Sequence, residues 1–213
     1  MRIICLANSY RDGGRCVAGI NPETGAWIRP IPPGGGMIPE PHVHLAGGEL
    51  ALLDVVEINL DPPRFDTKYQ RENHEVRDWE WRVVGRVQPR DLLPYCDDAS
   101  PVFFNFGERV NADRLEQEAP PAWQSLRLIR PRELEFEPDE RDRHKWRAAF
   151  LDAGADWYSL RLTDPVALDR LHRGQPPAAG SLLTVSLCEP WAPLDDPAKP
   201  PACYKIAAAV IEL

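Results

Sequence analysis

The chain has 213 residues, 43% hydrophobic and 27% charged, so it is long enough for one large packed domain or two small ones. Its formal net charge is −8. Because proteins that bind duplex nucleic acid without regard to sequence usually carry a basic excess, this charge argues against such binding but leaves room for a local basic site.

The first part of the chain is expected to form short strands, because 23 prolines disfavour long helices and central strands. Alternating or continuous apolar runs predict strands at 2–8, 15–20, 26–31 and 52–60. The segment Asn21–Gly25 has the composition of a hairpin turn. Residues 32–48 are rich in glycine and proline and are expected to form a loop, and Asp61-Pro62-Pro63 is expected to end the strand 52–60.

Residues 64–120 are less regular than the rest of the chain. Single helical turns are expected at 89–93 and 112–118, within a polar segment that covers or connects the flanking parts. Pro120-Pro121 is the best candidate boundary, which divides the chain into residues 1–120 and 121–213.

The second part shows a more definite order. Strands are predicted at 125–130, 133–137, 145–151, 157–163, 182–188 and 204–212. Between the fourth and fifth of these, Asp164 is placed to cap a helix that begins at Pro165 and ends near residue 172. Several strands, one short helix and two further strands is the order of an OB-fold, although SH3-like and PUA-like barrels produce similar strings.

Five sequence segments follow one another along the chain: CLANSYRDGGRCVAG at 5–19, GAWIRPI at 25–31, LLDVVEI at 52–58, YQRENH at 69–74 and CYKIAAAVIE at 203–212. Together they resemble the bacterial dual OB domain-containing proteins. The resemblance implies two tandem OB-like β-barrels with a mixed, partly helical middle segment, in a mainly β protein. It also implies a role related to nucleic acid, in a bacterial defence or mobile-element setting.

The first turn offers one candidate phosphate site. Arg11 and Arg15 flank the Asp12-Gly13-Gly14 turn, whose backbone N–H groups are able to form an anion nest. Asn8 and Ser9 are expected to line the same end of the barrel or to close the turn through their side chains. The alternative is an ordinary hairpin turn with exposed arginines.

Trp27 and Arg29 form a second candidate site, because alternation places both on the strand face opposite Ile28. An exposed tryptophan beside an arginine is a platform for a stacked base. The alternative is that Trp27 packs beneath the irregular middle segment, since large aromatic side chains are usually well buried.

The YQRENH phrase supplies the third candidate. Gln70 and Asn73 carry amides that read base edges, and Tyr69 is able to stack on a base. Glu72 and His74 have the chemistry of an acid and a base. A solvated loop or a polar contact between the barrels explains the same residues without a ligand.

The five cysteines form no C-x-x-C pair, and no metal or other cofactor is expected. Cys5, Cys16 and Cys203 lie in apolar contexts, which predicts reduced, buried and metal-free thiols. Met1-Arg2 lead directly into a strand without a secretory leader, and no apolar run has the length of a membrane span, so we expect a cytoplasmic protein with no membrane contact.

These patterns favour binding over catalysis. The expected function is recognition of a nucleotide or of single-stranded or modified nucleic acid, by Asn8, Ser9, Arg11, Arg15, Trp27, Arg29, Tyr69, Gln70 and Asn73. One alternative is a small enzyme that acts on a nucleotide or nucleic acid through Glu72, His74 or Cys16. Another is an adaptor with a protein partner, which the acidic net charge favours.

Overall fold

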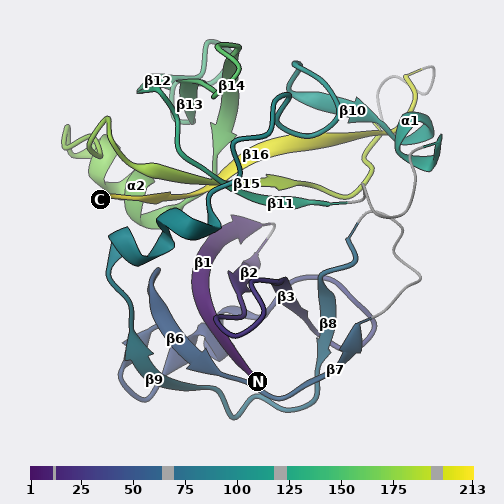
Figure 1. Ribbon diagram of the computed structural model, residues 1–213, viewed down its shortest axis with the longest axis vertical. Helices are drawn as coiled ribbons and strands as arrows, with labels where there is room; N and C mark the ends of the chain where they lie inside the picture. Colours follow the sequence, from purple (N-terminus) through teal and green to yellow (C-terminus); the bar gives the residue numbers. More distant parts are fainter. Residues whose placement is uncertain (12, 64–69, 118–123, 193–198) are drawn as a thin grey trace.

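Most strands of the computed structural model, which describes residues 1–11, 13–63, 70–117, 124–192 and 199–213, belong to two curled sheets (Figure 1). The first sheet contains β1 (Arg2–Arg11), β2 (Gly14–Ile20), β3 (Trp27–Ile31), β6 (Asp54–Glu57), β7 (Leu60–Pro63), β8 (Asn73–Val76) and β9 (Arg82–Arg86). Its order is β7-β8-β3-β2-β1-β6-β9. Two 3-10 helices, η1 (Glu40–Val43) and η2 (Pro89–Tyr95), and the short pair β4 (His44–Leu45) and β5 (Gly48–Glu49) accompany it.

The second sheet contains β11 (Leu126–Ile129), β12 (Glu133–Pro138), β13 (Trp146–Leu151), β14 (Trp157–Leu162), β15 (Leu182–Leu187) and β16 (Ala202–Ile211), in the order β11-β15-β16-β14-β13-β12. A further strand, β10 (Arg109–Asn111), pairs with β16. Helix α2 (Pro165–His172) lies between β14 and β15 in the chain, and α1 (Ala112–Gln117) follows β10. The chain is therefore mainly β, as predicted.

Asp164 caps α2 as predicted. Its Oδ1 accepts hydrogen bonds from the backbone N–H groups of Val166 and Ala167, and Pro165 occupies the first helical position. Its second oxygen accepts a hydrogen bond from the Val210 N–H on β16, so this one side chain also ties the helix to the sheet.

Three expectations for the first part of the chain were wrong. The strand expected at 52–60 is divided into β6 and β7, and Leu53 adopts a positive φ of 76° at its start. Pro62 and Pro63 lie within β7 instead of ending a strand, which is tolerated because β7 is an edge strand. The segment 32–48 contains η1, β4 and the first residue of β5 in addition to loop.

Residues 102–115 pack on the second sheet although they precede Pro120. Val102, Phe103, Val110 and Leu115 are buried in the same hydrophobic cluster as β13, β14 and β15. The expected boundary at Pro120-Pro121 lies outside the described residues, so the division at 120 stays a prediction.

Strand β1 is buried on both faces, which explains its continuous apolar run. Ile3 and Cys5 belong to the core of the first sheet, whereas Ile4 and Leu6 contact the second half of the molecule. The pairing of β1 with β2 shifts register between Cys5 and Ala7, opposite Gly19. A Cβ atom at Gly19 would lie 2.1 Å from the carbonyl oxygen of Ile4, so only glycine fits at this position.

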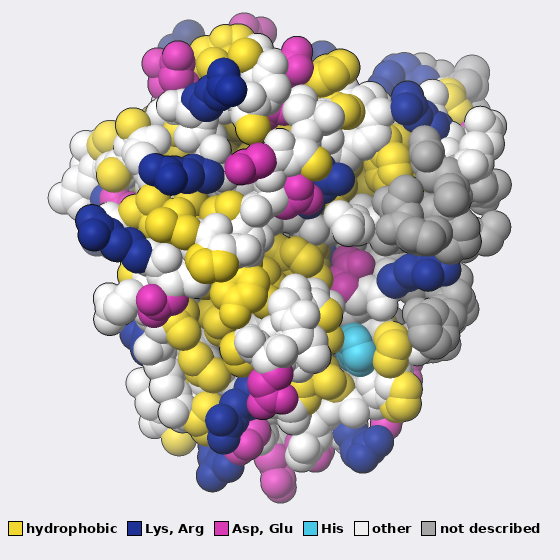
Figure 2. Space-filling model, in the orientation of Figure 1, with side chains coloured by type: hydrophobic (Ala, Val, Ile, Leu, Met, Phe, Trp, Pro, Cys, Tyr) yellow, Lys and Arg dark blue, Asp and Glu magenta, His cyan; other side chains and the backbone are white. Residues whose placement is uncertain are grey.

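The two sheets share an apolar interface. Ile4 and Leu6 of β1 pack with Leu128, Leu182 and Ile211 of the second sheet, and small side chains bring the backbones together beside them at Ala7, Ala18, Ala208 and Ala209. Figure 2 shows hydrophobic side chains gathered across the middle of one face, where the two halves of the molecule meet. The halves are therefore packed as one unit.

One buried hydrogen bond crosses the same interface. The Thr184 hydroxyl of β15 donates to the Leu6 carbonyl oxygen of β1 at 2.6 Å, and Thr184 is completely buried.

In the described ranges, no helix is long and apolar enough to cross a membrane.

Candidate nucleic-acid interface

A cleft of about 590 Å³ opens between the two sheets. We call it the inter-sheet cleft. The first part of the chain lines it with Ser9, Tyr10, Arg11, Cys16, Arg29 and Gln70. The second sheet, with the segment 102–115 that packs on it, lines the cleft with Glu108, Arg147, Arg161, Thr163, Ser186, Leu187, Cys188, Glu189, Trp191, Tyr204, Lys205 and Ile206. Because it takes side chains from both sheets, the cleft depends on how the sheets pack.

Cationic side chains outnumber acidic ones in the inter-sheet cleft. Five cations line it, namely Arg11, Arg29, Arg147, Arg161 and Lys205, against the two carboxylates Glu108 and Glu189. Most of this charge is neutralised, because Glu72 and Asp139, just outside the lining, also pair with Arg29 and Arg147. Arg161 is the guanidinium of the cleft with no carboxylate partner among the described residues, and an unpaired guanidinium in a cleft is a candidate contact for an anionic ligand.

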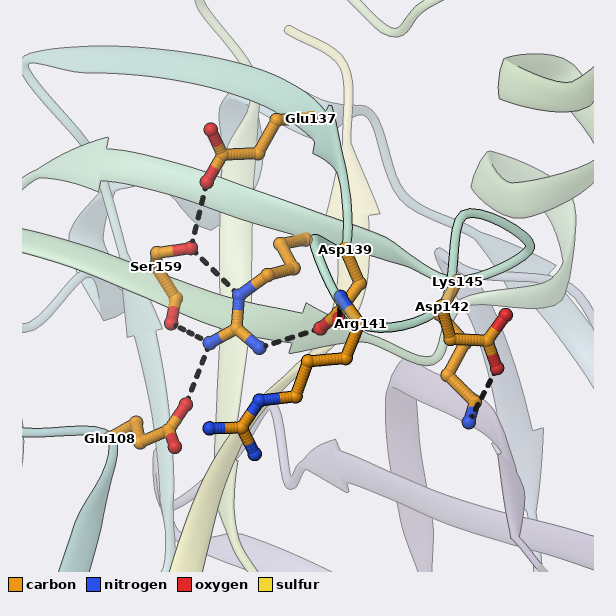
Figure 3. Close-up of polar contacts among 8 residues, drawn as sticks. Glu108, Glu137, Asp139, Arg141, Asp142, Lys145 and Ser159 are labelled. Carbon is orange, nitrogen blue, oxygen red and sulfur yellow. Dashed lines mark hydrogen bonds and ion pairs between the residues drawn. The ribbon is translucent and has the colours of Figure 1, made fainter.

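Arg147 on β13 is held rigidly. Its guanidinium donates to Glu108 at 2.7 Å, to Asp139 at 3.0 Å and to the Ser159 hydroxyl at 2.8 Å (Figure 3). Ser159 in turn donates to Glu137. In Figure 3, Glu108, Asp139 and Ser159 surround one guanidinium and Glu137 lies behind Ser159, so Arg147 shapes the cleft wall more than it offers free charge.

Arg161 on β14 lies directly opposite Arg147 in the antiparallel pairing of β13 with β14. It is exposed, and no described residue forms an ion pair with it. Because Glu108 and Asp139 already neutralise Arg147, Arg161 is the arginine of this pair that is able to contact an anionic ligand.

Aromatic side chains occur at the rim of the cleft. Trp191 is 54% exposed and Tyr10 is 51% exposed. The Trp191 ring meets the Tyr204 ring edge-on at 5.9 Å between centroids. Main-chain hydrogen bonds between Trp191 and Ala202 at the start of β16 hold the tryptophan in place. An exposed, positioned indole beside cations is able to stack on a nucleic-acid base.

The floor of the cleft is a buried polar network. The Arg29 guanidinium lies 3.1 Å from the Glu72 carboxylate, with side chains 5% and 7% exposed, and it donates to Ser125 at 2.9 Å and to Ser186 at 3.3 Å. Ser125 also donates to Glu72. The two serines belong to the second half of the chain, so this network joins the sheets.

The YQRENH segment contributes to the same network. The Gln70 amide donates to the Leu187 carbonyl oxygen and accepts a hydrogen bond from Asn73, whose own oxygen accepts from Arg29. This is the polar contact between the two halves that the sequence left open as an alternative. Tyr69 lies outside the described residues.

The expected shared face of Trp27 and Arg29 does not form a stacking platform. Trp27 is half-buried and packs on the apolar interface between the sheets, and Arg29 is only 4% exposed. The reason is that β3 lies between β2 and β8 within the first sheet, where the second sheet covers its outer face.

The first turn also differs from the expected phosphate site. Arg15 is buried and pairs with Glu40 at 3.2 Å and Glu49 at 2.6 Å. Asn8 donates to the Leu50 carbonyl oxygen at 2.8 Å and lines a different pocket. Arg11 does reach the inter-sheet cleft, where it pairs with Glu189 at 2.6 Å.

Of the nine expected binding residues, Ser9, Arg11, Arg29 and Gln70 line the inter-sheet cleft. Any contact of the nine with nucleic acid stays a prediction. The sequence interpretation missed Tyr10, Arg147, Arg161, Trp191, Tyr204 and Lys205. A usable signal was the lone tryptophan in the proline-flanked phrase EPWAP, since an aromatic side chain in a loop is often placed for contact.

The residues of the enzyme alternative do not form one group. Glu72 is held by Arg29, and the Nδ1 atom of His74 lies 3.0 Å from the Asp61 carbonyl oxygen on the first sheet. Cys16 lines the inter-sheet cleft instead.

The five cysteines are free thiols. Cys5 and Cys203 are buried as predicted, and burial raises the pKa of Cys5 to about 12. Cys16 is only partly buried, which corrects the expectation for that residue. Within the described part of the chain, no three His, Cys, Asp or Glu side chains are grouped so as to hold a metal ion.

A smaller pocket of about 260 Å³ lies between the first sheet and α2. Its two cations are neutralised, because Arg86 pairs with Asp54 at 2.7 Å and Arg170 pairs with Glu212 at 2.5 Å. The inter-sheet cleft is therefore the better candidate for an anionic ligand.

Comparison with protein families gives one match. The family described as the dual OB-containing domain matches residues 1–210, nearly the whole chain. No curated protein and no solved structure matches the chain.

Proposed function

The chain belongs to the dual OB-containing domain family, and on that premise we propose that its inter-sheet cleft binds a nucleotide or single-stranded nucleic acid, including modified forms. A dual OB domain is a module of the type that binds nucleic acids or nucleotides. The observation that carries the proposal is the meeting of Arg11, Arg161 and the exposed Trp191 in one cleft, where Arg161 has no carboxylate partner among the described residues.

Each part of the cleft has a distinct role in this proposal. Arg11 and Arg161, the cations nearest the solvent, contact phosphate. Trp191 stacks on a base, because every base presents an aromatic face and stacking needs no particular sequence. The buried network around Arg29 holds the two walls of the cleft in register and does not itself contact the ligand.

The decisive experiment is a titration of internally labelled single-stranded DNA and RNA, followed by fluorescence anisotropy. Affinity should fall as salt rises from about 50 to 200 mM, because phosphate contacts release counterions. Trp191→Ala should cost about 1–3 kcal/mol of binding free energy if a base stacks there. Trp157→Ala is the matched control, since Trp157 is 53% exposed but lies outside the cleft.

Two results would contradict the proposal. One is the absence of binding to DNA, to RNA and to a mononucleotide at low salt. The other is an equal loss of affinity in the Trp191 and Trp157 variants. The bacterial defence or mobile-element setting and the cytoplasmic location remain predictions.

A further inference from the structure

The ion pairs of the inter-sheet cleft differ in how firmly they are held. The pair of Arg29 with Glu72 is buried, with side chains 5% and 7% exposed. Arg147 is bound by two carboxylates, those of Glu108 and Asp139. A ligand phosphate that took either arginine would have to leave a buried carboxylate unpaired or displace two carboxylates at once. Both pairs are therefore expected to persist when a ligand binds.

The pair of Arg11 with Glu189 is of a different kind. The Nη2 atom of Arg11 donates to one carboxylate oxygen of Glu189 at 2.6 Å, and the two side chains are 35% and 47% exposed. Neither side chain forms a further hydrogen bond or ion pair with a described residue. Exposed pairs of this kind are weak, because water solvates both charges when they separate. Glu189 is thus the carboxylate of the cleft that a ligand displaces most easily.

The pair also bridges the two walls of the cleft. Arg11 ends β1 in the first sheet, and Glu189 lies just after β15 of the second sheet. Backbone hydrogen bonds to β16 fix the residue before Glu189, and also Trp191 two residues after it. Because the backbone is held on both sides, the carboxylate is able to leave Arg11 by rotation of its own side chain.

A phosphate group is a better partner for Arg11 than the Glu189 carboxylate is. The carboxylate accepts from one N–H group, and the remaining N–H groups of the Arg11 side chain donate to no described residue. A planar guanidinium is able to donate two parallel hydrogen bonds to a phosphate. Since a phosphate and a carboxylate repel each other, the phosphate is expected to replace Glu189 instead of sharing the arginine with it.

We propose that Glu189 is an internal competitor of the ligand. Its carboxylate occupies Arg11 in the unbound protein, and an incoming phosphate displaces it. This inference rests on the proposed function and assigns a regulatory contact to the same cleft. The contact lowers the affinity for anionic ligands and ties the two walls together until one binds.

The test is a double-mutant cycle of Arg11→Gln and Glu189→Gln. Each protein is titrated by calorimetry against a short single-stranded DNA, the matching RNA and a nucleoside monophosphate. With Arg11 present, Glu189→Gln should raise the affinity about two- to fivefold, which corresponds to the strength of an exposed ion pair. In the Arg11→Gln background the same substitution should change the affinity by less than about 1.5-fold, because there is no arginine to release.

The matched control is Glu133→Gln. It also removes one negative charge from an exposed side chain, but Glu133 lies outside the cleft. Its effect on affinity should be less than about 1.5-fold, since salt screens exposed charges that are far from the ligand. Thermal unfolding of each variant identifies any that fails to fold.

The outcomes separate this inference from the proposed function. If the wild type binds a ligand and Glu189→Gln leaves the affinity unchanged, the competitor role is overturned and the proposed function stands. A lower affinity also overturns it, because Glu189 would then position Arg11 for the ligand. An equal gain with and without Arg11 overturns it as well, since the loss of one negative charge would explain the gain. Failure of the wild type to bind any of the three ligands overturns both proposals.

Discussion

Arg15 and Arg29 of the first sheet are buried beside carboxylates, whereas Arg161 and Lys205 of the second sheet line the cleft without one. The paired arginines hold segments together: Arg29 joins β3 to two serines of the other half, and Arg15 joins β2 to η1 and β5. Neither cation contacts a described acidic group: Arg161 is exposed in the cleft, and the Lys205 ammonium is buried, with Asn105 accepting its hydrogen bonds. The difference teaches that the carboxylate partners of a basic side chain, more than its residue type, decide whether it holds the fold together or is available to a ligand.

Among variants that test this comparison, Arg29→Met should have the largest effect on stability. The variant leaves the Glu72 carboxylate buried without its counter-charge, so we expect a loss of about 3–5 kcal/mol in the free energy of unfolding. Urea denaturation measures it. Adding Glu72→Gln should restore part of the loss, and a single variant as stable as the wild type would show that the network does not join the sheets.

Lys205→Met tests a cation that has no carboxylate partner, through the pH dependence of the free energy of unfolding. The pKa of Lys205 is about 7 in the folded protein and near 10.5 when unfolded, so the unfolded state binds more protons between these values. The wild type therefore gains stability as pH rises above 7, and the variant lacks this gain. We expect the stability difference to shift by about 2 kcal/mol in favour of the wild type between about pH 7 and 9.

The control for that measurement is Lys145→Met. Lys145 pairs with Asp142 in an exposed loop, with side chains 47% and 38% exposed. Its variant should follow the wild type across the same pH range. A parallel pH dependence of the Lys205 variant would mean that Lys205 is charged throughout this range.

Arg15→Met should have a smaller effect than Arg29→Met. Its partners Glu40 and Glu49 are 50% and 40% exposed, so water solvates them once the arginine is removed. We expect a loss of about 1 kcal/mol, measured by the same urea denaturation. A loss as large as that of Arg29→Met would show that burial of the arginine matters more than burial of its partners.

Arg161→Gln should change stability least, by no more than about 0.5 kcal/mol, because the side chain is exposed and unpaired. Its effect should appear in binding instead. The slope of log affinity against log salt should decrease by about 1, as expected for one lost phosphate contact. An unchanged slope would exclude Arg161 from the phosphate contacts.

The sequence predicted the strands of the second sheet and helix α2 well, because alternation and the Asp164-Pro165 start are local signals. The dual OB resemblance is confirmed by the family match. The site was harder to predict. Arg29 and Arg161 both lie on strands at alternating positions, and only pairing across 96 and 157 residues reveals that Arg29 is buried against Ser125 and Ser186.

Lys205 gave no local signal at all. It occurs within the apolar run CYKIAAAVIE, where a single lysine suggests a solvent-facing position on an edge strand. In the structure β16 is central, and Asn105, 100 residues earlier in the chain, accepts its hydrogen bonds. The environment of this amine is a product of tertiary packing.

The apolar interface between the sheets has a consequence for inheritance. Ala7 and Ala18 lie against Ala208 and Ala209, and Thr184 satisfies the Leu6 carbonyl oxygen, so each half of the gene encodes a surface shaped for the other. A recombination event between the halves would join surfaces that had diverged separately, with clashes or voids as the result. We therefore expect the two OB-like halves to be passed on together and to mutate in step, instead of being shuffled as separate modules.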